Sequence, residues 1–164
     1  MDAIFFLTFV VNFIRIMDAL AHAHSGLRWI LLALVIVAII KGFGGISGKK
    51  PFTAGDKKVA LFALITCHLQ LLIGLILYFF GDAVSFDAPM SNALARFFLL
   101  EHSSGMLLGI ILITIGYSTS KRADNDKKKF KRIAIWYTFG LLIILGSIPW
   151  PFMEKFKNAS IGWF

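Results

Sequence analysis

Four long runs of apolar residues divide this chain, and they constrain its fold more than any other feature. They extend over residues 27–45, 59–80, 97–119 and 133–150. A helix needs about 20 residues to cross the roughly 30 Å hydrocarbon layer of a membrane. An open sheet in lipid would leave backbone groups without hydrogen bonds. The sequence therefore predicts an all-α fold, a transmembrane four-helix bundle.

Composition supports a membrane protein and excludes a nucleic-acid partner. Of the 164 residues, 58% are hydrophobic, compared with about 45–50% in an average soluble domain. The formal net charge is +8, but the basic residues lie between the apolar runs and not on a surface interleaved with aromatic contacts. We therefore expect the lipid bilayer to be the partner. The one cysteine, Cys67, lies inside an apolar run, so an intrachain disulfide is excluded.

By composition the chain divides into an apolar N-terminal extension, a four-helix transmembrane domain and a short C-terminal tail, over residues 1–20, 21–152 and 153–164. The extension is apolar over residues 4–14, which is too short for a span, and charged residues follow. We expect it either to form an extra helix along the outer membrane interface or to extend the first span. Residues 17–19 repeat residues 1–3, so two translation starts, Met1 and Met17, stay open.

The charges of the connecting segments predict an orientation. Lysine and arginine cluster in the loops over residues 46–58 and 120–132, whereas residues 81–96 carry two aspartates and a single basic residue at their end. Short loops rich in lysine and arginine stay on the cytoplasmic side. We expect a multi-pass protein of a bacterial inner membrane, with both basic loops cytoplasmic and with the loop over 81–96 and both termini periplasmic.

Histidines are the candidate functional residues, because ionisable groups inside a span are costly and mark function by default. His22 and His24 precede the first span, His68 lies in the middle of the second, and His102 lies in the outer part of the third. At about 1.5 Å rise per residue, His102 is roughly 9 Å and His24 roughly 16 Å outward of the midplane. Two ligand pairs stay open, His68 with His102 and His24 with His102, and His22 is the weakest candidate.

Haem b is the cofactor that these residues suggest. Neutral imidazole is a good axial ligand for haem iron, two such ligands favour electron transfer, and bundle cores commonly hold such cofactors. Zinc or copper alone would need thiolate or carboxylate help at one depth, and only Cys67 and Glu101 are near. Arg28, one turn after His24, is expected to pair with Glu101 or a haem propionate, or to extend to the interface. Histidines that only hydrogen-bond between helices are the alternative.

Small and amide residues near the histidines allow two interpretations each. Gly105, Gly109 and Gly116 form a stripe on the third span. Such a stripe either lets a neighbouring helix approach closely or, at Gly105 and Gly109, clears space for a porphyrin beside His102. Gln70 either hydrogen-bonds a quinone or, as we favour, a neighbouring helix.

The chain resembles a group of small bacterial four-span membrane proteins labelled cytochrome b-like. The resemblance covers residues 17–152 and is carried by four segments, with the sequences Ala-His-Ser-Gly-Leu-Arg-Trp, Lys-Lys-Pro-Phe-Thr, His-Leu-Gln-Leu-Leu-Ile-Gly and Arg-Ile-Ala-Ile, at residues 23–29, 49–53, 68–74 and 132–135. It implies a haem b bound through His24, His68 and His102, and a place in a respiratory or redox assembly. The fourth span has no histidine, which departs from the two-haem pattern of larger cytochrome b families.

Two functions follow as hypotheses. In the first, the protein binds haem b in the outer half of the bundle through His24, His68 or His102 and relays electrons between a quinol and a redox partner. In the second, it is a structural or assembly subunit of a larger membrane complex and has no cofactor of its own. Both describe a carrier or accessory subunit more readily than a stand-alone enzyme. A transporter is less well supported, because the chain has no broken-helix repeat, although a homo-oligomer formed through the glycine stripe would change that.

Overall fold

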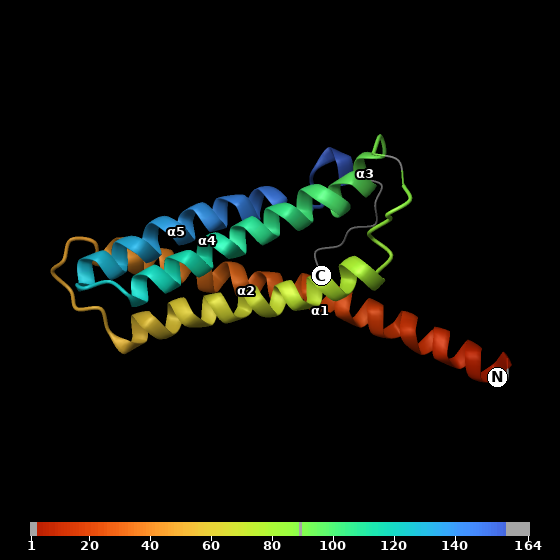
Figure 1. Cartoon of the computed structure of the whole chain (residues 1–164), viewed down its shortest axis with the longest axis horizontal. Helices are drawn as coiled ribbons and strands as arrows, with labels where there is room; N and C mark the ends of the chain where they lie inside the picture. The colour runs from red at the N-terminus through yellow and green to blue at the C-terminus, as the bar shows by residue number, and fades with distance from the viewer. Residues whose placement is uncertain (1–2, 89, 157–164) are drawn as a thin grey trace.

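The computed structural model describes residues 3–88 and 90–156, and within them the only regular structure is helical. The elements follow one another along the chain as shown in Figure 1. They are α1 (Ala3–Gly45), α2 (Ala54–Phe80), α3 (Ala93–Arg96), the π-helical η1 (Phe97–His102), α4 (Ser103–Lys121), α5 (Asp126–Ser147) and the 3-10 turn η2 (Glu154–Phe156).

The long helices form an up-and-down bundle. Helix α1 packs against α2 and α5, and α4 packs against α5 and, less extensively, α2. Helices α1 and α4 therefore lie diagonally across the bundle (Figure 1). The spans are α1, α2, α4 with the preceding turns, and α5, each long and apolar enough to cross a membrane. The predicted all-α transmembrane four-helix bundle is confirmed, and the protein is a multi-pass membrane protein.

Helix α1 runs without a break from Ala3 to Gly45, so the N-terminal extension prolongs the first span and does not form a separate helix. This is one of the two arrangements expected from the sequence. No proline interrupts the segment. A helix of 43 residues is about 65 Å long, twice the thickness of the hydrocarbon layer. Its first half leaves the bundle and extends alone (Figure 1).

The core of the bundle combines apolar side chains with close helix contacts. Val35, Ala63 and Ile113 are fully buried, each on a different helix. Small residues let neighbouring backbones approach: a Cβ added at Gly42 would lie 2.9 Å from the backbone nitrogen of Ala134. These contacts fix how α1 and α5 sit against each other and hold the rest of the bundle around them.

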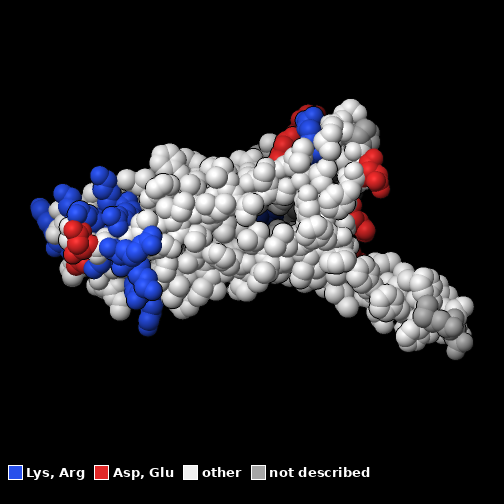
Figure 2. Space-filling view, viewed as in Figure 1, with Lys and Arg blue, Asp and Glu red and all other residues white. Residues whose placement is uncertain are grey.

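One end of the bundle is strongly basic, and the other carries both acidic and basic side chains. Lysine and arginine gather at the end formed by the loops over residues 46–53 and 122–125, and acidic side chains dot the other end (Figure 2). At the basic end Lys41 Nζ and Asp56 Oδ1 are 2.8 Å apart and join α1 to α2. Asp56 also completes a capping box with Thr53, which starts α2.

Candidate histidine site

Two of the predicted histidines meet across the centre of the bundle. The ring centroids of His24, on α1, and His102, at the end of η1, are 6.3 Å apart, with the rings inclined at 69°. Their helices are the diagonal pair, so the two imidazoles lie where little backbone packing occurs. Of the two histidine pairs left open by the sequence, the structure brings His24 and His102 side by side.

His102 is held by α5. Its Nδ1 lies 2.8 Å from the carbonyl oxygen of Ser147. A carbonyl only accepts hydrogen bonds, so Nδ1 carries the proton and a neutral ring keeps its lone pair on Nε2. Metal-ligating histidines characteristically donate their other ring N–H to a backbone carbonyl or carboxylate, which fixes tautomer and orientation.

The backbone around His102 has an unusual form. Residues Phe97–His102 make a π-helical segment, which bonds residue i to residue i+5 instead of i+4. Such turns occur most often as short bulges at functional sites. Here the segment leads directly into α4, so it sets the direction in which the His102 ring leaves the helix.

His24 is positioned by α2. The Gln70 amide donates a hydrogen bond from Nε2 to the His24 carbonyl, at 2.6 Å, which confirms the predicted bond to a neighbouring helix. The ring lies against Gly74, where an added Cβ would be 3.2 Å from His24 Cε1. Its Nδ1 is buried and has no hydrogen-bond partner within residues 3–88 and 90–156. A buried polar atom without a hydrogen-bond partner is energetically costly and rare in native structures.

A buried arginine lies one turn from the histidines. Arg28 is only 9% exposed, and its guanidinium carbon lies 5.3 Å from the ring centroid of Trp29 and 5.8 Å from that of Trp150. The space-filling view shows a hollow between α2 and α4 with basic atoms visible at its floor (Figure 2). A positive charge therefore lies within the apolar part of the bundle, on the same helix as His24.

The spacing of the two rings is compatible with a shared ligand and with simple ring packing. Imidazole nitrogens bound at about 2 Å on opposite sides of a metal hold their ring centres roughly 6 Å apart. Edge-to-face packing also occurs at about 4.5–7 Å, so spacing alone does not choose between them. The spacing of the rings, together with His24 Nδ1 that has no hydrogen-bond partner within residues 3–88 and 90–156, makes the pair a candidate site for a bound ligand.

The other sequence candidates lie elsewhere. His68 is exposed on the outside of α2, and its Nδ1 lies 2.9 Å from the Leu64 carbonyl of the same helix, so it does not join the pair. His22 is also exposed. Cys67 is fully buried in the core. No group of three or more histidine, cysteine or acidic residues gathers as a metal site in the part of the chain that the structure describes.

The glycine stripe packs against α5. A Cβ at Gly105 would collide with the Ser147 hydroxyl, and one at Gly109 would lie 2.7 Å from Ile144 Cγ1. Helix α5 fills the space that these glycines leave, as the helix-packing interpretation expects. We therefore do not include Gly105 and Gly109 in the site.

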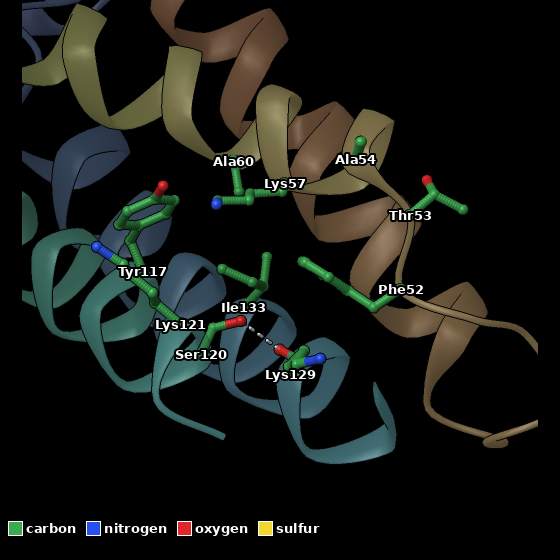
Figure 3. Close-up of a pocket in the computed structure, with 10 residues that line it drawn as sticks. All are labelled: Phe52, Thr53, Ala54, Lys57, Ala60, Tyr117, Ser120, Lys121, Lys129 and Ile133. Carbon is green, nitrogen blue, oxygen red and sulfur yellow. Dashed lines mark hydrogen bonds between the residues drawn. The ribbon is translucent and has the colours of Figure 1, made fainter. Parts of the chain in front are cut away.

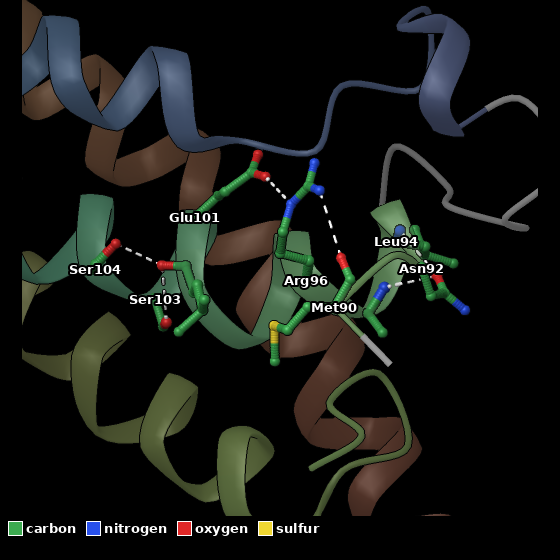
Figure 4. A network of polar contacts seen from close by, with 9 residues as sticks. Met90, Asn92, Leu94, Arg96, Glu101, Ser103 and Ser104 are labelled. Carbon is green, nitrogen blue, oxygen red and sulfur yellow. Dashed lines mark hydrogen bonds and ion pairs between the residues drawn. The ribbon is translucent and has the colours of Figure 1, made fainter. Parts of the chain in front are cut away.

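A polar network lies next to His102, around the start of η1. Asn92 caps α3, and Arg96 Nε donates to Glu101 Oε1 at 3.0 Å (Figure 4). Arg96 Nη1 also reaches the Met90 carbonyl at 3.5 Å. Glu101 is exposed and directed to this network, while its neighbour His102 points into the bundle. The side chains of these two adjacent residues therefore lie in different surroundings.

Comparison with protein-family models, with curated proteins and with solved structures finds no match to this chain.

Sequence reasoning missed three residues of the site. Ser147, whose carbonyl holds His102, is the last residue of α5, and Trp150 follows just after that helix. Neither α5 nor the residues after it carry a histidine, and they gave no sequence signal. Gly74 lies one turn past Gln70 and within the segment that carries the family resemblance. A rule that pairs each histidine with small residues at its own depth on the neighbouring span would have selected Gly74.

Proposed function

We propose that this protein binds one haem b and relays single electrons, and that His24 and His102 are the residues that would hold the haem iron. The observation that carries the proposal is the meeting of these rings across the bundle, with His102 oriented by Ser147 and with His24 Nδ1 left without a partner. The donor set fits, since two neutral imidazoles suit haem iron and favour electron transfer over oxygen binding.

Residues around the pair support the same function. Ser147 holds the tautomer of His102, and Gln70 ties the backbone of His24 to α2. The Arg28 guanidinium supplies the positive charge that a buried propionate needs. When bound, the haem supplies the one-electron chemistry, and the chain supplies orientation, charge and exclusion of water.

The setting we propose is a bacterial inner membrane. The basic end of the bundle would face the cytoplasm, by the positive-inside rule, and the histidine site would lie toward the periplasmic side. A quinol and a redox protein or respiratory complex are the proposed partners. The resemblance of residues 17–152 to cytochrome b-like proteins points the same way.

An absorption spectrum tests this function. Protein purified from haem-replete cells should show a Soret band and, after reduction, an α band. His102→Ala should lower the haem-to-protein ratio at least about tenfold, because even outer-shell losses cost about 10–100-fold. His68→Ala, which removes an exposed histidine, is the matched control and should keep the bands. Colourless wild-type protein, or equal loss in both variants, contradicts the proposal.

A second candidate function, an assembly subunit without its own cofactor, is favoured by the N-terminal half of α1. Nine large apolar side chains in this stretch are exposed, and they are Ile4, Phe5, Phe6, Leu7, Phe9, Val11, Phe13, Ile14 and Ile16. A surface of this kind marks an interaction with protein or membrane. Under this function the full chain should co-purify with a larger complex in mild detergent, and a chain starting at Met17 should not. Purification alone in both forms contradicts it.

A further inference from the structure

A pocket of about 250 Å³ lies at the basic end of the bundle, between α2 and α4. Figure 3 shows its lining, which comes from α2, α4, α5 and the segment preceding α2. Three lysines, Lys57, Lys121 and Lys129, contribute to it, and the lining contains no acidic residue. The pocket is remote from the histidine pair, which lies toward the opposite end of the bundle.

Two of the three lysines form no ion pair with the described residues. Lys129 Nζ is 2.8 Å from Asp126 and 5.8 Å from the Phe52 ring centroid, so its charge is already partnered. Lys57 and Lys121 make no ion pair within residues 3–88 and 90–156. The carboxylate beside Lys57, that of Asp56, is engaged with Lys41. Two ammonium groups therefore line one pocket without a counter-charge.

The rest of the pocket is apolar or a hydroxyl donor. Ala60 and Ile133 are buried and Phe52 is half-buried; together they give the pocket apolar walls. Tyr117 and Lys57 both project into the space between α2 and α4 (Figure 3). A group with an anionic part and a short apolar part matches this combination better than a hydrated inorganic ion does.

We propose that this pocket binds the head group of an anionic phospholipid. Its phosphate would lie between the Lys57 and Lys121 ammonium groups, and the first methylene groups of its acyl chains would lie against the apolar wall. The location supports a lipid source, because the basic ends of membrane spans lie at the depth of lipid head groups. The site is independent of haem.

Titration of dioctanoyl phosphatidylglycerol into the full-length protein in neutral detergent tests the proposal. The double variant K57Q/K121Q should bind about 25-fold more weakly, since each lysine near an anionic lipid contributes about fivefold. The matched control K49Q/K50Q makes the same charge change in the exposed loop and should lose less than about threefold at physiological salt, where distant charges are screened. The charge-keeping variant K57R/K121R should retain most of the affinity.

Each alternative outcome overturns the proposal. Equal losses in K57Q/K121Q and K49Q/K50Q would reduce the effect to general charge, and equal binding of dioctanoyl phosphatidylcholine would remove the preference for anionic lipid. Displacement of the lipid by millimolar glycerol 3-phosphate would assign the pocket to a soluble phosphate compound. If K57Q/K121Q does not fold, the single variant K121Q should still show about a fivefold loss.

Discussion

The charged groups at the basic end of the bundle and the buried polar groups around the histidine pair are held in opposite ways. At the basic end, charged side chains pair with one another close to water, as in Lys41 with Asp56 and Lys128 with Asp124. At the other end, a few polar groups lie among apolar neighbours and bond to backbone carbonyls, as in His102 with Ser147 and Gln70 with His24. Exposed ion pairs contribute little and weaken with salt, whereas buried bonds fix geometry.

This difference predicts which substitutions should have large effects on ligand binding or stability. Changes at the histidine end should alter ligand binding by removing a positioned group, whereas changes to an exposed ion pair should have little effect on stability because water and salt screen the two charges. Four predictions sharpen or break this contrast, and they follow from the largest expected effect to the smallest.

His24→Ala should remove bound haem, with a fall of at least about tenfold in the haem-to-protein ratio, because outer-shell losses alone reach that size. His22→Ala is the matched control, since His22 is two residues away on the same helix and exposed. The pyridine haemochrome assay on purified protein measures both. Retention of haem in the His24 variant would break the contrast at its strongest point.

Gly109→Ala should destabilise the bundle by about 1–3 kcal/mol, the usual cost of overpacking. The new Cβ would lie 2.7 Å from Ile144 Cγ1 and 3.1 Å from the Gly140 carbonyl oxygen. At Gly146 an added Cβ meets nothing within 4 Å, so Gly146→Ala should be neutral or stabilising by up to about 1 kcal/mol. Unfolding in mixed micelles measures both, and equal effects would show that α4 and α5 are not closely packed here.

Tyr137→Phe should cost about 0.6 kcal/mol and no more than about 1.7 kcal/mol, the average and the maximum found for hydrogen bonds between membrane helices. The Tyr137 hydroxyl is buried and donates to the Ala60 carbonyl at 2.8 Å. The control is Tyr78→Phe, because the Tyr78 hydroxyl lies 3.4 Å from the Leu99 carbonyl, too far for a strong bond. The same unfolding assay should therefore detect little change at Tyr78, and a larger loss there would contradict the assignment.

Asp124→Asn should leave stability unchanged at pH 7. The hydrogen bond from Lys128 lowers the pKa of the Asp124 carboxyl below its ordinary value, but the pair is exposed and screened. A lowered folded-state pKa gives a contribution that is present above the ordinary value and is lost as the pH falls through the folded value. The free energies of unfolding of the wild type and the variant should differ little at pH 7, and the difference should become smaller still as the pH is lowered to 3.

The fold was predictable from sequence because lipid imposes one solution on long apolar runs. Four runs gave four spans, and the loop charges marked which ends share a side. The continuous α1 was left as one of two alternatives, since an apolar stretch such as residues 4–14 suits an interfacial helix and a prolonged span equally. The π-helical turn over residues 97–102 had no sequence signal.

The sequence predicted how deep in the membrane the histidines lie, but not the direction in which their side chains point. Counting residues brought His24 within reach of His102, and the structure agrees. The same count favoured His68 equally, yet Cys67 faces the core and His68 faces outward. Neighbouring residues on a helix differ by about 100°, and a span that is apolar on all sides gives no pattern to choose the inner face. The residue count therefore predicts the level in the bundle at which a side chain lies. Only the packing of the helices determines whether that side chain faces the core.

Electron paramagnetic resonance of the oxidised, purified protein tests the central proposal most directly, because the spin state of ferric haem reports both axial ligands. Two imidazoles should give a low-spin signal in the wild type and in His68→Ala, and His24→Ala and His102→Ala should each convert any remaining haem to high spin. A low-spin signal that survives in either of these two variants, or one that is lost only in His68→Ala, would contradict a haem held between His24 and His102.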